Sequence, residues 1–287
     1  MTAPPGTVTW RRLLAEATDE VGLTDARRIV QSASGREGLE WVQGLDQPVT
    51  QRGVAAVDAM VARRRAGEPL QYVLGRWGFR SLDLLVDPRV LIPRPETEVV
   101  ADLAIEELRR LGGGGRPVTA ADLGTGSGAL ALSLAAEVVT AEVWATDRSE
   151  DALAVARANL AGLGRPGSRV RLVAGNWFGA LPADLRGRLD LVVSNPPYVA
   201  EGEPLPPEVA DWEPQEALVA GPRGDEAARA ILAEAAAWLT RPAALVLELA
   251  PTQATSLAGA ATSAGAAEVR VRPDLSGRER VLVARWA

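Results

Sequence analysis

The most informative side chains lie in a short turn that follows an apolar run. Residues 189–194, Leu-Asp-Leu-Val-Val-Ser, have the composition of a buried strand, and Asn195, Pro196, Pro197 and Tyr198 follow directly. Because two successive prolines restrict the backbone, this pattern predicts a fixed turn at the carboxyl edge of a sheet. Ligands bind at that edge in open α/β sheets.

Such a turn suits the transfer of a group to a planar nitrogen. The lone pair of an amide or aromatic amine is delocalised, so an enzyme gains rate by holding both N–H hydrogens and aiming the nitrogen at an electrophile. The side-chain oxygen of Asn195 and the carbonyl oxygen of Pro196 are suitable acceptors, and Tyr198 would cover the flat face of the target. With Pro197 they form a candidate substrate-binding turn. A proline-rich turn that only ends a strand is the alternative interpretation.

A glycine-rich turn predicts a cofactor site. It opens with Asp122 between a predicted strand and a predicted helix, and it contains Gly124, Thr125, Gly126, Ser127 and Gly128. Glycines at alternate positions let the backbone approach a ligand and expose amides at a helix N-terminus. Asp147 ends the next predicted strand, at the distance where an acidic residue accepts hydrogen bonds from ribose hydroxyls. Together these features indicate a cofactor that contains adenosine.

Asn176 and Trp177 follow the third predicted strand. An indole at this edge can stack on adenine while the neighbouring amide bonds the edge of the base. Packing of Trp177 and Phe178 in the core is an equally open interpretation. A dinucleotide enzyme needs a second half-site and usually a proton donor for hydride chemistry, whereas a methyl donor needs only an oriented acceptor. The favoured cofactor is therefore S-adenosylmethionine, which leaves as S-adenosylhomocysteine, with Asn195 at the border of its site.

The composition excludes several kinds of chemistry. The 287 residues include no Cys and no His, which excludes disulfides, thiolate nucleophiles, imidazole bases and common zinc sites, so no metal is expected. All 31 basic residues are Arg, and the abundance of Ala, Gly and Pro is typical of a GC-rich genome. The net charge of -6 argues against broad attraction to nucleic acid phosphates. No apolar run approaches the roughly 18 residues of a membrane span, and no signal-peptide pattern is present. We therefore expect a soluble, cytoplasmic protein.

Periodicity predicts an α/β protein with a small N-terminal helical domain. Short helices are predicted from about Thr9 to Gly67, in a helical domain of residues 1–75, and a β-hairpin linker follows at residues 76–92. From residue 118 onward strands and helices alternate, which predicts a mainly parallel, Rossmann-like sheet of seven strands. The predicted strands are residues 118–123, 141–146, 170–173, 189–194, 243–249, 269–271 and 281–284. The predicted helices are residues 99–111, 129–138, 150–160, 225–239 and 252–264. The last two strands are too close for a crossover helix, so an antiparallel hairpin is expected there.

As a set, these motifs resemble a family of S-adenosylmethionine-dependent class I methyltransferases. These enzymes are the protein glutamine N5-methyltransferases that modify class-one peptide chain release factors. The resemblance covers nearly the whole chain. Its motifs are residues 69–75 (PLQYVLG), 91–98 (LIPRPETE), 122–128 (DLGTGSG), 195–198 (NPPY), 213–214 (EP), 217–218 (AL) and 277–280 (GRER). Adenine-N6 DNA methyltransferases share the Asn-Pro-Pro-Tyr tetrapeptide, so the resemblance rests on the whole set of motifs.

The resemblance implies a specific reaction. The substrate would be the glutamine of the Gly-Gly-Gln motif of a release factor, methylated on its side-chain nitrogen. The glycine loop would cradle the methionine part of the cofactor, Asp147 would hold the ribose, and Trp177 would lie by the adenine. Asn195 and Pro196 would grip the glutamine amide, and Tyr198 would pack against it.

The resemblance also implies a division of labour. Residues 1–75, together with the open edge of the sheet, would recognise the folded release factor, and residues 93–287 would form the methyltransferase domain. We expect a monomer that does not bind nucleic acid directly. The alternatives are a methyltransferase for a ribosomal protein glutamine, one for an exocyclic amine of nucleic acid, and a cofactor-binding module without catalysis. Glu96 and Glu98 are interpreted as helix-dipole partners with an organising role at the cofactor pocket, rather than as an acid–base pair.

Overall fold

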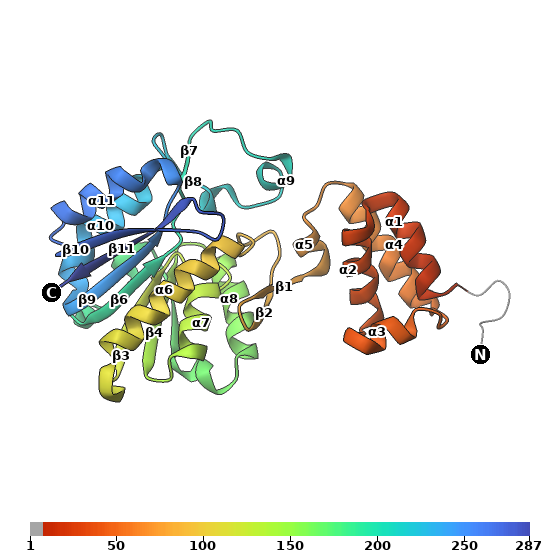
Figure 1. Cartoon of the computed structure of the whole chain (residues 1–287), viewed down its shortest axis with the longest axis horizontal. Helices are drawn as coiled ribbons and strands as arrows, with labels where there is room; N and C mark the ends of the chain where they lie inside the picture. Colours follow the sequence, from red (N-terminus) through yellow and green to blue (C-terminus); the bar gives the residue numbers. More distant parts are fainter. Residues whose placement is uncertain (1–7) are drawn as a thin grey trace. The chain divides into compact units, whose positions relative to one another are not determined.

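The described chain divides into two compact units. A computed structural model describes residues 8–287, so residues 1–7, with which the predicted helical domain begins, lie outside the described residues. One unit contains the chain up to Arg76 together with Pro206–Trp212, and we call it the helical unit. The other contains Trp77–Leu205 and Glu213–Ala287, and we call it the sheet unit (Figure 1).

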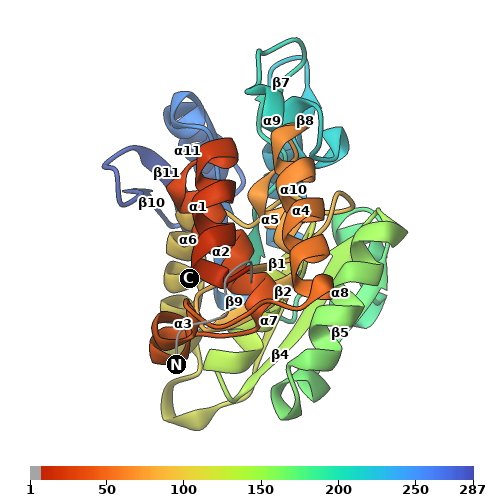
Figure 2. The same cartoon turned by 90° about the vertical axis from the view of Figure 1, so that its right-hand side faces the viewer.

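The helical unit consists of short helices around one apolar core. They are α1 (Trp10–Val21), α2 (Leu23–Ser34), α3 (Gly38–Gly44), α4 (Gln51–Arg65), α5 (Leu70–Leu74) and α9 (Pro207–Ala210). The hydroxyls of Thr9 and Thr50 accept hydrogen bonds from the first turns of α1 and α4, and so cap these helices. Figure 2 shows α1, α2 and α4 side by side. Their buried faces contribute Leu13, Ala17, Ile29, Val30, Val57 and Val61 to the core.

Arg64 connects α4 with the segment Pro206–Trp212. Its guanidinium donates to Asp25 of α2 over 2.6 Å and to Glu208 of α9 over 2.8 Å. Arg64 and Glu208 are 144 residues apart in the sequence. A short segment that follows the Asn195 turn in the chain therefore belongs to the helical unit.

The sheet unit is built on one mainly parallel sheet. Within residues 8–287, seven strands lie in the order β10-β11-β9-β6-β3-β4-β5. They are β3 (Val118–Leu123), β4 (Ala141–Asp147), β5 (Val170–Ala174), β6 (Leu189–Ser194), β9 (Leu239–Glu248), β10 (Glu268–Pro273) and β11 (Glu279–Trp286). Strand β11 runs antiparallel to both β9 and β10, whereas the pairs among β3, β4, β5, β6 and β9 are parallel. The predicted fold class and the predicted terminal hairpin are confirmed.

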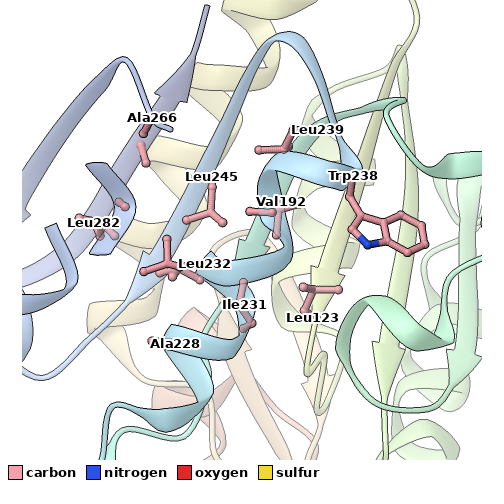
Figure 3. Packing of buried hydrophobic residues seen from close by; sticks show 14 of the residues in the cluster. Leu123, Val192, Ala228, Ile231, Leu232, Trp238, Leu239, Leu245, Ala266 and Leu282 are labelled. Atoms are coloured by element: carbon pink, nitrogen blue, oxygen red, sulfur yellow. The ribbon is translucent and has the colours of Figure 1, made fainter. Parts of the chain in front are cut away.

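Helices cover both faces of this sheet (Figure 1). One face carries α6 (Pro95–Leu111), α7 (Ala129–Glu137) and α8 (Glu150–Gly162), and the other carries α10 (Glu226–Trp238) and α11 (Ala254–Ser263). Because side chains alternate along a strand, every second residue packs against the helices on one face and the residues between them pack against the helices on the other. Leu123, Val192 and Leu245 face α10, as Figure 3 shows. Trp238 at the end of α10 stacks on Phe178, with 5.5 Å between the ring centroids.

Smaller elements complete the unit. The strands β1 (Arg76–Phe79) and β2 (Leu82–Leu85) form the predicted hairpin, whereas the pair β7 (Val199–Ala200) and β8 (Val219–Gly221) is not predicted. Short 3-10 helices lie at Gly113–Gly115, Arg165–Arg169, Trp177–Ala180, Ala183–Leu185, Gln215–Ala217 and Pro251–Gln253. Strand β9 begins at Leu239 rather than at residue 243, because the strand continues through Pro242, a residue that usually ends one. None of the helices in residues 8–287 is long and apolar enough to cross a membrane.

Candidate active site

Strand β3 lies where the order of the sheet reverses. Its neighbours are β4 on one side and β6 on the other, and all three run in the same direction. In open α/β sheets a crevice forms at the carboxyl ends of the strands at such a point. The glycine loop follows β3, Asp147 ends β4 and Asn195 follows β6. Neighbouring strands therefore bring these predicted site residues to one edge.

A cavity of about 310 Å³ opens at this edge and is lined by the sheet unit. Its volume is in the range of small-molecule sites. The predicted site residues in its lining are Gly124, Thr125, Gly126, Ser127, Asp147, Asn176, Trp177, Asn195 and Pro197. Gly128, Pro196 and Tyr198 are not in the lining. Residues that were not predicted to bind substrate or cofactor also line it, among them Pro93, Thr97, Pro214 and Glu226.

The glycine loop is held from beneath by a buried acid. One carboxylate oxygen of Asp122 accepts from the Thr125 hydroxyl over 2.6 Å and from the Ala131 N–H over 3.1 Å. Burial raises the pKa of Asp122 to about 7. Gly124 has φ 75°, and a Cβ there would lie 3.1 Å from the Trp177 ring. Both the left-handed backbone and the close indole require glycine at this position.

Asp147 binds the backbone around it with both oxygens. One oxygen accepts from the N–H of Gly126 and the other from the N–H of Ser149, each over 2.9 Å. Burial is the main cause that raises the pKa of Asp147. Each carboxylate oxygen has two lone pairs, so both keep capacity for a further donor. Asp147 thus has a structural role in addition to the binding role that was predicted.

Asn159 of α8 is a residue that the sequence reasoning missed. Its side-chain nitrogen donates to the carbonyls of Ser127, over 2.9 Å, and Leu85, over 3.1 Å. Its oxygen accepts from the Leu85 N–H over 2.7 Å. Asn159 therefore ties the glycine loop to the hairpin strand β2. An amide at helical spacing from the buried Ala156 was the available signal, because buried polar side chains have partners.

Asn176 and Trp177 lie after β5 on the wall of the cavity. Asn176 is exposed, and Trp177 is half-buried with φ 44°, which is unusual for a residue other than glycine. The Trp177 indole packs against the apolar core below and also lines the cavity. Packing in the core therefore describes part of this side chain, and its contact with adenine stays a prediction.

Asn195 presents an unsatisfied acceptor. Its side-chain nitrogen donates to the Thr97 hydroxyl over 3.2 Å. Its oxygen, Oδ1, is buried and has no hydrogen-bond partner in the part of the chain that the structure describes. An unmade hydrogen bond at a buried acceptor costs about 1–3 kcal/mol, so such a group is expected to have a role.

Glu226 is a second side chain of the lining with a buried oxygen that lacks a partner within residues 8–287. Its other oxygen accepts from the Arg223 N–H over 3.0 Å. Glu226 lies in the first turn of α10, where the helix dipole stabilises a carboxylate. The N-terminus of α10 therefore stabilises the Glu226 carboxylate, whereas Asn195 follows a strand and is not part of a helix.

Tyr198 anchors the turn outside the lining of the cavity. The Arg280 guanidinium lies over its ring, 5.6 Å from the centroid, in a cation–π contact. Burial raises the pKa of Tyr198 to about 12, so its hydroxyl keeps its proton at neutral pH. The Tyr198 carbonyl accepts from the Gln253 side chain over 3.0 Å. The contact predicted between Tyr198 and an acceptor group stays a prediction.

Glu213 joins two of the motifs recognised in the sequence. This buried carboxylate accepts from the Ile92 N–H over 3.2 Å and from the Arg94 guanidinium. Burial is the main cause that raises the pKa of Glu213, and the Arg94 charge opposes it. Pro93 and Pro214, next to these partners, both line the cavity. The ion pair therefore holds one wall of the cavity in place.

The first turn of α6 places a different residue at the cavity from those that were predicted. Glu96 pairs with Arg278 over 3.3 Å, and Glu98 accepts from the Arg80 N–H over 2.9 Å. Neither carboxylate is in the lining of the cavity, whereas Thr97 between them is. Thr97, rather than either acid, therefore contributes to the wall of the cavity.

The fold has counterparts among known proteins. The family profile of the methyltransferase small domain matches residues 102–208, and that of the PrmC N-terminal domain matches residues 8–75. The crystal structure of a methyltransferase from Pyrococcus furiosus shares the fold, with a TM-score of 0.52 at 20% identity, covering 79% of this chain and 96% of that chain. The sheet order and these matches define a class I methyltransferase.

Two relatives are similar along almost their whole length. The release factor glutamine methyltransferase of Cereibacter sphaeroides is 40% identical over 276 residues, which cover 96% of this chain and 94% of the relative. That of Deinococcus radiodurans is 41% identical over 265 residues, which cover 92% of this chain and 91% of the relative. The chain therefore belongs to the release factor glutamine methyltransferase family, and the resemblance seen in the sequence is confirmed.

Proposed function

We propose that this protein uses S-adenosylmethionine to methylate the side-chain nitrogen, N5, of the glutamine in the Gly-Gly-Gln motif of class-one peptide chain release factors. Membership of the family supports the type of reaction, and the names of the relatives support the substrate. The observation that carries the proposal is the buried Oδ1 of Asn195, a residue of the cavity lining, because this oxygen has no hydrogen-bond partner within residues 8–287. An amide N–H is the donor that this oxygen lacks.

The residues at the sheet edge fit the cofactor. The glycine loop would hold the methionine part with its backbone amides. The free lone pairs of Asp147 would accept from the ribose hydroxyls, and Trp177 and Asn176 would contact the adenine. When bound, S-adenosylmethionine supplies a methyl group on a positively charged sulfur.

The turn after β6 would hold the acceptor amide. Asn195 Oδ1 would accept one N–H hydrogen and the Pro196 carbonyl the other, which fixes the nitrogen toward the incoming carbon. The gain in rate comes from this positioning. No strong base is needed beforehand, because the nitrogen becomes acidic only once it carries the methyl group, and its extra proton can then pass to water. Pro197 and Tyr198 would keep the turn in this shape.

The helical unit would recognise the release factor as a folded protein. In this proposal residues 1–75 provide recognition, residues 76–92 link the domains and residues 93–287 carry out the transfer. The net charge of -6 supports a protein substrate over a nucleic acid.

Methyl transfer from tritiated S-adenosylmethionine tests this function. Recombinant release factor should become labelled, and a factor whose Gly-Gly-Gln glutamine is replaced by alanine should not. Label on the alanine factor would contradict the proposed substrate. Ribosomal proteins and an oligonucleotide serve as competing acceptors, and transfer to either of them in place of the release factor would support the corresponding alternative.

A further inference from the structure

Three polar side chains form a chain of hydrogen bonds that ends at the cavity. Glu248 ends β9 with 1% of its surface exposed, and Thr97, in the first turn of α6, is 4% exposed. The Thr97 hydroxyl oxygen lies 2.7 Å from a carboxylate oxygen of Glu248 and 3.2 Å from the side-chain nitrogen of Asn195. We propose that Thr97 and Glu248 are positioning residues that set the orientation of the Asn195 amide, an inference that rests on the proposed role of Asn195.

The fold brings these residues together. Strands β6 and β9 are parallel neighbours, with Ser194 opposite Leu247. Asn195, which follows β6, and Glu248, the last residue of β9, therefore lie side by side at this end of the sheet. Helix α6 packs across both strands and supplies Thr97 to this place. The arrangement depends on two strand ends and a helix start, which are more rigid than a loop.

The Glu248 carboxylate determines the direction of the hydrogen bonds. A carboxylate can only accept, so the single hydroxyl hydrogen of Thr97 points to Glu248. The Thr97 oxygen can then only accept from the third partner. A donor must face it, and the side-chain nitrogen of Asn195 is that donor. Amide orientation follows from such networks.

The orientation decides what Asn195 offers to the cavity. With its nitrogen bound to Thr97, the amide directs Oδ1 away from Thr97, and this oxygen has no partner in the described chain. A flipped amide would set two oxygens against each other at Thr97 and leave an N–H in place of the acceptor. The amide of a glutamine substrate would then meet a donor where it needs an acceptor.

Variants at residue 97 test this relay. Thr97→Val keeps the shape and removes the hydroxyl, whereas Thr97→Ser keeps the hydroxyl. We expect kcat of Thr97→Val to fall by about 10- to 100-fold, because the acceptor is no longer held in place, with affinity for S-adenosylhomocysteine within about twofold of wild type. Thr97→Ser should retain kcat within about threefold. Ser133→Ala is the matched control, because it removes a buried hydroxyl that donates to the Ala129 carbonyl in α7 and lies outside the lining of the cavity, and it should leave kcat unchanged.

A second measurement needs no acceptor substrate. The side-chain amide protons of Asn195 can be assigned by NMR as the pair that Asn195→Asp removes. Their exchange with water should be about tenfold faster in Thr97→Val than in wild type or Thr97→Ser, since the bond that protects them is lost.

The outcomes separate the two proposals. Wild-type kcat and wild-type amide exchange in Thr97→Val would overturn the relay, as would a Thr97→Ser variant as impaired as Thr97→Val. If wild-type protein labels no release factor, the proposed substrate fails instead, and the amide exchange rates still decide whether Thr97 orients Asn195.

Discussion

The two halves of the cavity differ in how their polar groups are satisfied. In the half next to β3 and β4, Asp147 uses both oxygens to bind the surrounding backbone, and Asn159 makes hydrogen bonds with all of its polar atoms. In the half next to β6, the Asn195 amide is held by its nitrogen alone, and its oxygen has no partner within residues 8–287.

This difference indicates separate roles for the two halves of the cavity. Where Asp147 and Asn159 already bind the surrounding backbone, the wall of the cavity holds its shape and can bind a cofactor without rearrangement. A half that keeps one oriented acceptor free reserves that acceptor for the reacting group, where it acts on the transition state. Substitutions in the first half should therefore change affinity and stability, and substitutions in the second half should change turnover.

The largest effect is expected for Asn195→Ala. Loss of the acceptor should lower kcat by about 10²- to 10³-fold, the loss seen when one oriented transition-state contact is removed, with cofactor affinity nearly unchanged. Steady-state methylation assays and calorimetric binding of S-adenosylhomocysteine measure the two quantities. Asn176→Ala is the matched control at the same edge, and it should weaken cofactor binding without this loss of kcat. Loss of affinity without loss of kcat in Asn195→Ala would erase the proposed distinction between the halves.

Asp147→Ala should have the opposite signature. We expect affinity for S-adenosylhomocysteine to fall by about 10- to 100-fold, because the ribose acceptor and two backbone hydrogen bonds are lost together. Turnover at saturating cofactor should fall much less. Asp147→Asn keeps one acceptor oxygen and should give an intermediate affinity. If Asp147→Ala binds the cofactor as tightly as wild type, its predicted contact with the ribose is wrong.

A smaller effect is expected from pH through Glu248. Burial raises the pKa of Glu248 to about 7, with Thr97, Arg280 and Arg94 favouring the carboxylate and Glu96 opposing it. Below about pH 7 the neutral acid can donate to Thr97, so the direction of the relay is no longer set. For a group with this pKa, kcat should fall about tenfold from about pH 8 to about pH 6.

Glu248→Gln sharpens this test. The neutral amide mimics the protonated acid, so kcat should be low and no longer rise with pH over this range. Asp122 also has a pKa raised to about 7 by burial and is unchanged in this variant. An acid limb that persists in Glu248→Gln would therefore assign the pH dependence to another group and contradict the role given to Glu248.

The smallest effect on turnover is expected for Asn159→Ala. Its three hydrogen bonds lie behind the glycine loop, away from the acceptor. Their loss should lower the free energy of unfolding by about 1–3 kcal/mol, measured by urea denaturation, and should weaken cofactor binding slightly. A fall in kcat comparable with that of Asn195→Ala would mean that the two halves are not independent.

Much of the fold could be predicted because its signals are local. The strands at residues 118–123 and 189–194 have the same bounds in the structure as in the prediction, since each apolar run ends at a glycine or proline turn. The pair of β7 and β8 was missed because strands of two and three residues show no periodicity. The membership of Pro206–Trp212 in the helical unit was missed because it depends on contacts such as Arg64 with Glu208, far apart in the chain.

The site could be predicted where the residues that act together are neighbours in the sequence. The glycine loop and the Asn195 turn consist of neighbours in sequence, so their spacing indicates a function. Thr97 and Glu248 are 151 residues apart, and only the tertiary structure makes them partners. An organising role was assigned from the sequence to Glu96 and Glu98, the neighbours of Thr97. Thr97 itself was not assigned a role, because a threonine in the first turn of a helix has no distinctive pattern.

The position of β11 has a consequence for how the chain is made. Strand β11 lies between β9 and β10, although it is synthesised after both. While residues 279–286 are still inside the ribosome, β10 has no partner strand, and the leucine-rich β9 has an unpaired edge. Unpaired apolar edges promote aggregation. A nascent chain of this protein is therefore expected to be prone to aggregation until β11 emerges, and a message truncated before β11 would yield a polypeptide that depends on chaperones.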